Sequence, residues 1–257
     1  MTTAQPGSTP PRPLRRVGAV LAMLALGQLG SGIVILSLAG PASAPLGATA
    51  LLLSLAPGPV AAATLRARAP GEVTSADLLT LLRHLAAGAL AAASVLVLGG
   101  ALPARSWPLA LLIAAALASD ALDGPVARRT GTAGPVGARI DMEADAALNL
   151  VLSVLAATVV GPWALAFGLM RYGFVAAAAV RPALSRPLAF SRLRRLIGAA
   201  QGVALLLAVV PAVPTRVATA VLVLALGLLV VSFARDVIAL ERRGRRERRE
   251  RRAGRPG

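Results

Sequence analysis

The stretch from Val217 to Leu240 reads VATAVLVLALGLLVVSFARDVIAL and contains two charged residues, Arg235 and Asp236. About 20 predominantly apolar residues are enough for a helix to cross the hydrocarbon core of a bilayer. The stretch lacks the alternation of apolar and polar residues that a membrane-spanning strand shows, and it is too long for such a strand. It therefore predicts a transmembrane α-helix.

Seven apolar runs of similar composition precede this stretch. They are Val17–Gly40, Ala44–Leu65, Ala76–Leu102, Trp107–Ala127, Ala138–Val160, Pro162–Val180 and Ile197–Val213. The 257 residues are 56% hydrophobic and 15% charged, with a mean hydropathy of +0.73, whereas soluble domains average about 45–50% apolar and about 25% charged residues. The sequence therefore predicts an all-α, polytopic membrane helix bundle with about eight spans.

The composition excludes several kinds of functional site. Because the chain has no cysteine, it can form neither a disulfide framework nor a thiolate metal site. Its single histidine, His84, excludes a zinc site built from several histidines. Aromatic residues make up 3% of the chain, which is too few to build stacking platforms for single-stranded nucleic acid.

The distribution of arginine predicts how the chain crosses the membrane. The 27 basic residues, all of them Arg, and the 11 acidic residues give a net charge of +16. With the N-terminus inside, the predicted cytoplasmic segments hold 22 arginines and the outer loops hold two, Arg105 and Arg216. Because cytoplasmic loops carry an excess of basic residues, this orientation is favoured. We expect a multi-pass integral protein of a bacterial plasma membrane.

The predicted spans divide the chain into four segments. These are a cytoplasmic lead-in at 1–16, two N-terminal spans within 17–69, a six-span core at 70–240 and a basic tail at 241–257. Cleavage of the first run as a signal peptide stays open, although its 24 residues exceed the usual apolar region of about 7–15. The tail holds nine arginines and is expected to lie near anionic lipid head groups, with nucleic-acid binding as the less favoured alternative.

Acidic residues concentrate in one short part of the chain. Five of the 11 fall within the 26 residues from Asp120 to Asp145. An ionisable residue inside a membrane span costs at least about 2.5–3.5 kcal/mol on insertion scales, so such residues indicate function. Carboxylates clustered without neighbouring amines require bound cations, and oxygen ligands suit Mg²⁺, Mn²⁺ or Ca²⁺. The cluster therefore predicts a divalent metal site.

Helical spacing sorts the cluster onto two faces. One face of a first helix carries Asp120, Asp123, Gly124, Ala127 and Arg128. One face of a second helix carries Gly137, Asp141 and Asp145, whereas Glu143 points elsewhere. Two antiparallel helices joined by a short loop would bring the four aspartates together. The small residues keep this face thin, so that a ligand or a neighbouring backbone can approach.

These residues form the pattern Asp-x-x-Asp-Gly-x-x-Ala-Arg, eight residues, Gly-x-x-x-Asp-x-x-x-Asp. The pattern resembles that of the CDP-alcohol phosphotransferase (CDP-alcohol phosphatidyltransferase) family at every defining position and spacing. Thr80-Leu81-Leu82-Arg83 is also similar to the Thr-x-x-Arg of the first core helix in that family. The resemblance covers roughly Thr74–Leu240, so the two N-terminal spans lie outside it.

The resemblance implies an enzyme of phospholipid biosynthesis. Such an enzyme moves a substituted phosphate from a CDP-alcohol, usually CDP-diacylglycerol, to an acceptor hydroxyl group and releases CMP. The implied ligands of two Mg²⁺ or Mn²⁺ ions are Asp120, Asp123, Asp141 and Asp145, and Asp145 is also the implied general base. The implied CDP-alcohol site consists of Asp120, Gly124, Ala127, Arg128 and Gly137.

The sequence does not identify the acceptor alcohol. The candidate residues for binding the acceptor or a phosphate are Arg83, Arg139, Arg192 and Arg195. Arg83 could instead snorkel toward the membrane surface, and the other arginines could reflect only the positive-inside bias. Ala146 stands where the glycerol-phosphate branch of the family usually has Lys, which argues against that branch.

Two other classes of function remain as alternatives. In a transporter the acids would form a cation path, but the compact cluster lacks the scattered relay that such a path needs. A non-catalytic scaffold of the same fold is the second alternative, and the intact set of four aspartates argues against it. The expected partners are CDP-diacylglycerol, the acceptor and membrane lipids, with no nucleic acid and with a homodimer as one option.

Overall fold

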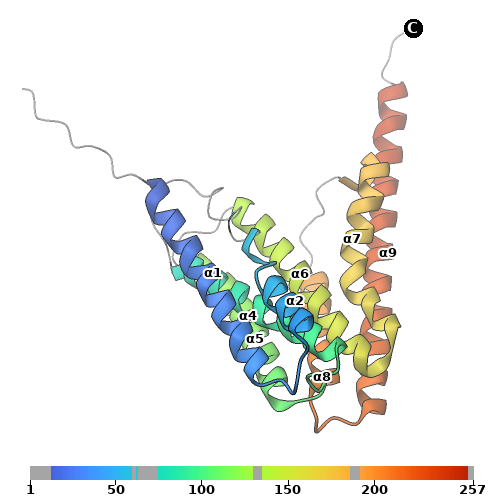
Figure 1. Cartoon of the computed structure of the whole chain (residues 1–257). Helices are drawn as coiled ribbons and strands as arrows, with labels where there is room; N and C mark the ends of the chain where they lie inside the picture. The colour runs from blue at the N-terminus through green and yellow to red at the C-terminus, as the bar shows by residue number, and fades with distance from the viewer. Residues whose placement is uncertain (1–12, 60–61, 63–74, 130–134, 186–191, 254–257) are drawn as a thin grey trace, which may run out of the picture.

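The computed structural model describes residues 13–59, 62, 75–129, 135–185 and 192–253 (Figure 1). Within these ranges every regular element is a helix. The α-helices are α1 (Pro13–Ser37), α2 (Ala44–Ser54), α4 (Ser75–Leu98), α5 (Trp107–Arg129), α6 (Pro135–Val160), α7 (Leu165–Val180), α8 (Arg192–Val209) and α9 (Thr215–Ala253). Two 3₁₀ helices, η1 (Pro162–Ala164) and η2 (Pro182–Ser185), flank α7. The predicted all-α class is confirmed.

Several helices are candidates for crossing a membrane. Among the described residues, Gly18–Ser37, Pro162–Val180 and Thr215–Gly244 are long and apolar enough to do so. Shorter apolar helical segments are Ala44–Ser54, Leu82–Leu98, Trp107–Ser119, Asp145–Val160 and Leu196–Val209. The protein is therefore a membrane protein with several candidate transmembrane helices, and the count of eight spans stays a prediction.

The predicted second span, residues 44–65, is not one continuous helix. The helix α2 has 11 residues and ends at Ser54, and residues 55–57 form a turn. A helix of this length rises only about 16 Å, which is about half the thickness of the hydrocarbon core. Pro57 and Pro59 explain the break, because proline has no amide hydrogen and its ring clashes with a helical carbonyl group. The prediction of an unbroken span was wrong here.

The basic tail continues the last apolar helix. The helix α9 runs for 39 residues from Thr215 to Ala253 without interruption, whereas the predicted span ended at Leu240. Arg and Glu both have high helix propensity, so the charged sequence after Glu241 sustains the helix that the apolar sequence begins. The tail is therefore helical as far as Ala253.

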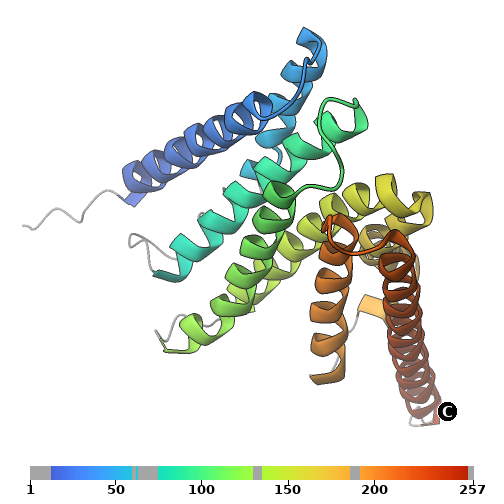
Figure 2. The same cartoon turned by 90° about the horizontal axis from the view of Figure 1, so that it is seen from below.

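The helices pack around α4 and α6. Figure 2 shows α4 lying between α1 on one side and α5 and α6 on the other, and α2 also packs against α4. On the far side of the bundle α7 and α9 run side by side (Figure 1), where the rings of Phe174 and Phe233 meet edge to face at 5.8 Å. The helix α8 connects the two groups by packing against α5, α6 and α9.

Leucine, isoleucine and alanine side chains fill the contact region between α4, α5, α6 and α8. Leu90, Ile113, Leu155 and Leu205, one from each helix, are completely buried. In lipid, helices associate through close packing of small residues rather than through the hydrophobic effect. Gly168 of α7 shows this most clearly, because a Cβ atom there would lie 2.5 Å from the Cα atom of Leu150 on α6.

Candidate active site

The two halves of the acidic motif lie on consecutive helices. Asp120 and Asp123 lie near the C-terminal end of α5, and Asp141 and Asp145 lie in the N-terminal half of α6. The two helices run in opposite directions, and the ends that carry the motif adjoin the short connection between them (Figure 2). This is the helix arrangement that the sequence predicts for the acidic cluster.

Asp145 is the member of the motif whose side chain the structure describes. The side chains of residues 120–144 lie outside the described part of the chain. The metal-binding roles of Asp120, Asp123 and Asp141 therefore stay predictions. The same holds for the CDP-alcohol residues Gly124, Ala127, Arg128 and Gly137. Among the described side chains no three His, Asp or Glu residues gather to hold a metal ion.

Arg83 of α4 forms an ion pair with Asp145 of α6. The distance from Nη1 of Arg83 to Oδ1 of Asp145 is 3.2 Å, and these residues are 62 positions apart in the sequence. The side chain of Arg83 is 1% exposed, whereas that of Asp145 is 42% exposed. A buried cation needs a paired anion, and the carboxylate of Asp145 supplies it. The snorkelling interpretation of Arg83 is therefore wrong, because the guanidinium group points into the bundle.

The exposure of Asp145 leaves its carboxylate accessible to a ligand. One oxygen of this carboxylate contacts the guanidinium group of Arg83, and the side chain still has 42% of its surface exposed. A carboxylate with this much exposed surface can serve as an oxygen ligand for Mg²⁺ or Mn²⁺. The donor chemistry of the motif, four carboxylates on two neighbouring helices, fits such an ion.

The comparisons with known proteins identify the family of the chain. A family model described as CDP-alcohol phosphatidyltransferase matches residues 73–233, well over half of the chain. The chain belongs to the CDP-alcohol phosphatidyltransferase family. No curated protein and no solved structure matches it significantly.

Family membership identifies the chain as a CDP-alcohol phosphotransferase, an enzyme of phospholipid synthesis. Members of this family typically use divalent metal ions. It does not support the transporter and scaffold alternatives. The matched segment includes Arg83 and all four aspartates of the motif. It begins after α1 and α2 and ends before Asp236.

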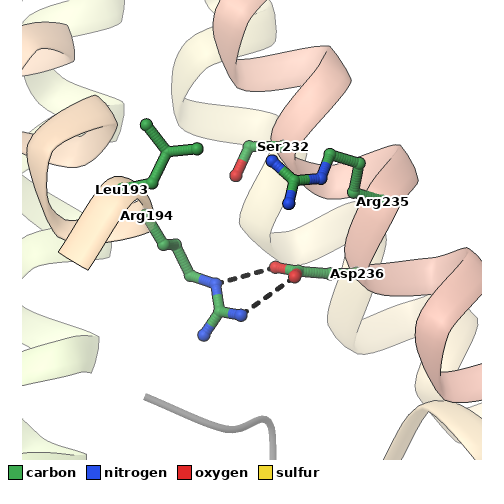
Figure 3. A pocket seen from close by; sticks show the side chains of 5 residues that line it. All are labelled: Leu193, Arg194, Ser232, Arg235 and Asp236. Atoms are coloured by element: carbon green, nitrogen blue, oxygen red, sulfur yellow. Dashed lines mark hydrogen bonds and ion pairs between the residues drawn. The ribbon is translucent and has the colours of Figure 1, made fainter. Parts of the chain in front are cut away.

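A second ion pair of this phosphatidyltransferase joins α8 to α9 (Figure 3). Nε of Arg194 lies 2.8 Å from Oδ2 of Asp236, and Nη2 of Arg194 lies 2.9 Å from Oδ1. Such two-point contacts are the strongest geometry for an arginine and a carboxylate. Leu193, Ser232 and Arg235 line the same pocket. Asp236 received no partner or role from the sequence, although a charged residue in a largely apolar span indicates a functional or paired residue.

The structure places the backbone of three of the four predicted acceptor residues but does not describe their side chains. Arg192 and Arg195 lie at the N-terminal end of α8, three positions apart, and Arg139 lies near the N-terminal end of α6. Their side chains fall outside the described part of the chain, so their roles stay predictions. Arg194, which lies between the first two, pairs with Asp236 and so joins α8 to α9.

Proposed function

We propose that this protein transfers a phosphatidyl group from CDP-diacylglycerol to the hydroxyl group of an acceptor alcohol and releases CMP. The observation that carries the proposal is the ion pair between Arg83 and Asp145. It lies within the segment that matches the family. It also brings the last aspartate of the motif together with the arginine of Thr80-x-x-Arg83, from a different helix.

In the reaction the acceptor oxygen forms a bond to the phosphorus of the phosphatidyl group. The bond between that phosphorus and the bridging oxygen of the diphosphate breaks, and CMP leaves with the bonding electrons. Asp145 accepts the proton of the acceptor hydroxyl group as general base. Arg83 holds the carboxylate in place, and this positioning matters because a carboxylate is a weak base for an alcohol.

The four aspartates are the proposed ligands of two Mg²⁺ or Mn²⁺ ions. They are Asp120, Asp123, Asp141 and Asp145. When bound, such ions neutralise the negative charge on the diphosphate and on the departing CMP. Asp120 and Arg128 would contact the CDP group, and Gly124, Ala127 and Gly137 would leave room for it to lie close to the helix backbones.

A panel of acceptors tests the reaction directly. Purified protein is incubated with labelled CDP-diacylglycerol, metal and one acceptor at a time, including inositol phosphate, serine, glycerol phosphate and phosphatidylglycerol. The expected result is release of CMP together with one new lipid whose mass identifies the acceptor. Absence of CMP release with every acceptor and metal in the panel would contradict the proposed function.

The acceptor is proposed to carry a phosphate or to be an anionic lipid. Arg139, Arg192 and Arg195 would bind it, because the guanidinium group contacts phosphate at two points. The double substitution Arg192→Gln and Arg195→Gln should raise the acceptor KM at least about tenfold, since each charge-assisted contact contributes about 1.5–3 kcal/mol. The KM for CDP-diacylglycerol should stay nearly unchanged. Arg242→Gln is the matched control, because Arg242 is an exposed arginine of the tail. An unchanged acceptor KM in the double variant would contradict the proposed role of Arg192 and Arg195 in acceptor binding.

The active site is proposed to face the cytoplasm. Because the chain has no native cysteine, single cysteines can report the orientation without background. A cysteine at Thr132 should react with an impermeant reagent from the cytoplasmic side only, and one at Thr215 from the outside only. The reverse pattern would overturn the orientation that the arginine distribution favours.

A further inference from the structure

The turn of α4 that follows Arg83 is contacted from the side opposite to α6. On one side Arg83 reaches across to Asp145 of α6. On the other side α1 and α2 contact the residues from His84 to Gly88. Figure 2 shows α4 between these two groups of helices. The position of α4 relative to α6, and with it the contact between Arg83 and Asp145, therefore depends on both sides.

Gln28 of α1 makes a buried polar contact with α4. Its side chain is 1% exposed, and its Nε2 atom donates a hydrogen bond to the carbonyl oxygen of His84 at 3.4 Å. A buried side-chain amide without a partner would be costly, so this contact specifies how α1 and α4 align. At the preceding position, Gly27 allows Leu85 to pack closely, since a Cβ atom at Gly27 would lie 2.7 Å from Cδ2 of Leu85.

Gly88 allows the backbone of α2 to reach α4. A Cβ atom at Gly88 would lie 2.4 Å from the carbonyl oxygen of Ser54 and 3.3 Å from Cγ of Gln28. Ser54 is the last residue of α2, and it is completely buried. Because the nearest atom is backbone rather than the end of a flexible side chain, alanine at position 88 has to move α2 or α4.

We propose that α1 and α2 position Arg83 against Asp145, with Gln28 and Gly88 as positioning residues. Both helices lie outside the segment that matches the family, and no acidic residue or histidine occurs before residue 72. Their contribution therefore acts through the placement of α4 and not through a group that touches the reacting atoms. The inference rests on the proposed function, in which Arg83 orients the general base.

A double-mutant cycle tests this inference. Gly88→Ala should lower kcat by roughly tenfold, but by less than about twofold when Arg83→Gln is already present, since residues that act through one contact are non-additive. The KM for CDP-diacylglycerol should stay nearly unchanged in Gly88→Ala. Gly30→Ala on α1 is the matched control, because a Cβ atom there meets nothing within 4 Å; it should leave kcat unchanged in both backgrounds.

The same cycle measured on thermal unfolding does not depend on turnover. If Gly88→Ala disturbs the contact between Arg83 and Asp145, Arg83→Gln should lower the melting temperature less in the Gly88→Ala background than in the wild-type background. Gln28→Met, which keeps the length of the side chain and removes the amide, gives a second variant if Gly88→Ala does not fold. Additive effects on melting temperature and on kcat would overturn the inference. If the wild-type protein shows no turnover, that result contradicts the proposed function. The melting-temperature cycle would still test whether α1 and α2 position Arg83 against Asp145.

Discussion

At the end of the bundle where α1 meets α2 and α8 meets α9, the contacts that join the connecting segments end on neutral oxygen acceptors. Toward the opposite end, ion pairs join the helices. At the first end the amide of Gly40 donates to the carbonyl oxygen of Ala101 at 2.8 Å. Arg105 donates to the carbonyl oxygen of Val210 at 2.8 Å and to Oγ1 of Thr215 at 2.9 Å. It also donates to the carbonyl group of Val213.

Toward the opposite end, which we call the charged end, three of the described links join a guanidinium group to a carboxylate. The pairs are Arg83 with Asp145, Arg194 with Asp236, and Arg181 with Glu241. Phosphates compete for guanidinium groups, and divalent metal ions compete for carboxylates. The contacts of Arg105, in contrast, go to neutral oxygens. We therefore expect one end to hold the bundle together and the charged end to exchange contacts for a ligand.

The largest effect is expected at the metal ligands of the charged end. Asp120→Asn, Asp123→Asn and Asp141→Asn should each lower turnover on the order of 10²-fold or more, because each removes a negative charge that holds the ions. Each variant should also require more metal for half-maximal activity. The protein should still fold, as measured by an unchanged elution volume in detergent. Near-native turnover in any two of the three would contradict the site.

Removal of the metal should have a comparable effect without any substitution. Activity should disappear in chelator and return with Mg²⁺ or Mn²⁺. Excess Ca²⁺ should inhibit, because its longer and looser coordination misplaces the phosphates. CMP release measured along a metal titration checks this, with a heated sample as the blank. Full activity in chelator would contradict a metal site at this end.

At the opposite end a substitution should affect stability and leave chemistry intact. Arg105→Gln removes the donor to partly buried carbonyl groups in the connection between α8 and α9. A fully buried carbonyl left unsatisfied destabilises by about 1–3 kcal/mol, so a partly buried one should cost less. The melting temperature should fall while kcat per folded molecule stays unchanged. Arg216→Gln is the matched control, because Arg216 lies at the same end and is exposed. A large fall in kcat for Arg105→Gln would contradict the expectation that this end affects stability and not chemistry.

The smallest effect is expected at the ion pair that Figure 3 shows. The side chain of Arg194 is 37% exposed and that of Asp236 is 20% exposed, so solvent and salt screen their attraction. Asp236→Asn should destabilise by no more than about 1 kcal/mol, the usual upper range for pairs near the surface. The difference in melting temperature from wild type should shrink as salt rises. A loss of stability that does not change with salt would mean that the carboxylate of Asp236 pairs with a group other than Arg194.

The sequence predicted the helices more completely than their contacts. Seven of the eight predicted apolar runs correspond to continuous helices. They could be predicted because the composition and length of a run along the chain are enough to indicate a membrane helix. The break after Ser54 was missed, although Pro57 and Pro59 were visible, because hydropathy alone counts proline among residues that a span tolerates.

The site was predictable where its residues are close in sequence and not where the fold brings them together. Helical spacing placed Asp141 and Asp145 on one face, but no spacing indicates that Arg83, 62 positions away, pairs with Asp145. Asp236 and Gln28 were missed for the same reason. Their partners, Arg194 and the carbonyl group of His84, are determined by how helices pack.

The role of Asp145 as general base can be measured through CMP release. Wild type, Asp145→Asn and Arg105→Gln are compared side by side with CDP-diacylglycerol, acceptor and Mg²⁺. Wild type and Arg105→Gln should release CMP at similar rates per folded molecule. Asp145→Asn should lose activity on the order of 10²–10⁴-fold, the usual contribution of a general base, because the amide cannot accept the proton of the acceptor. Release of CMP by Asp145→Asn at a rate close to that of wild type would contradict the account.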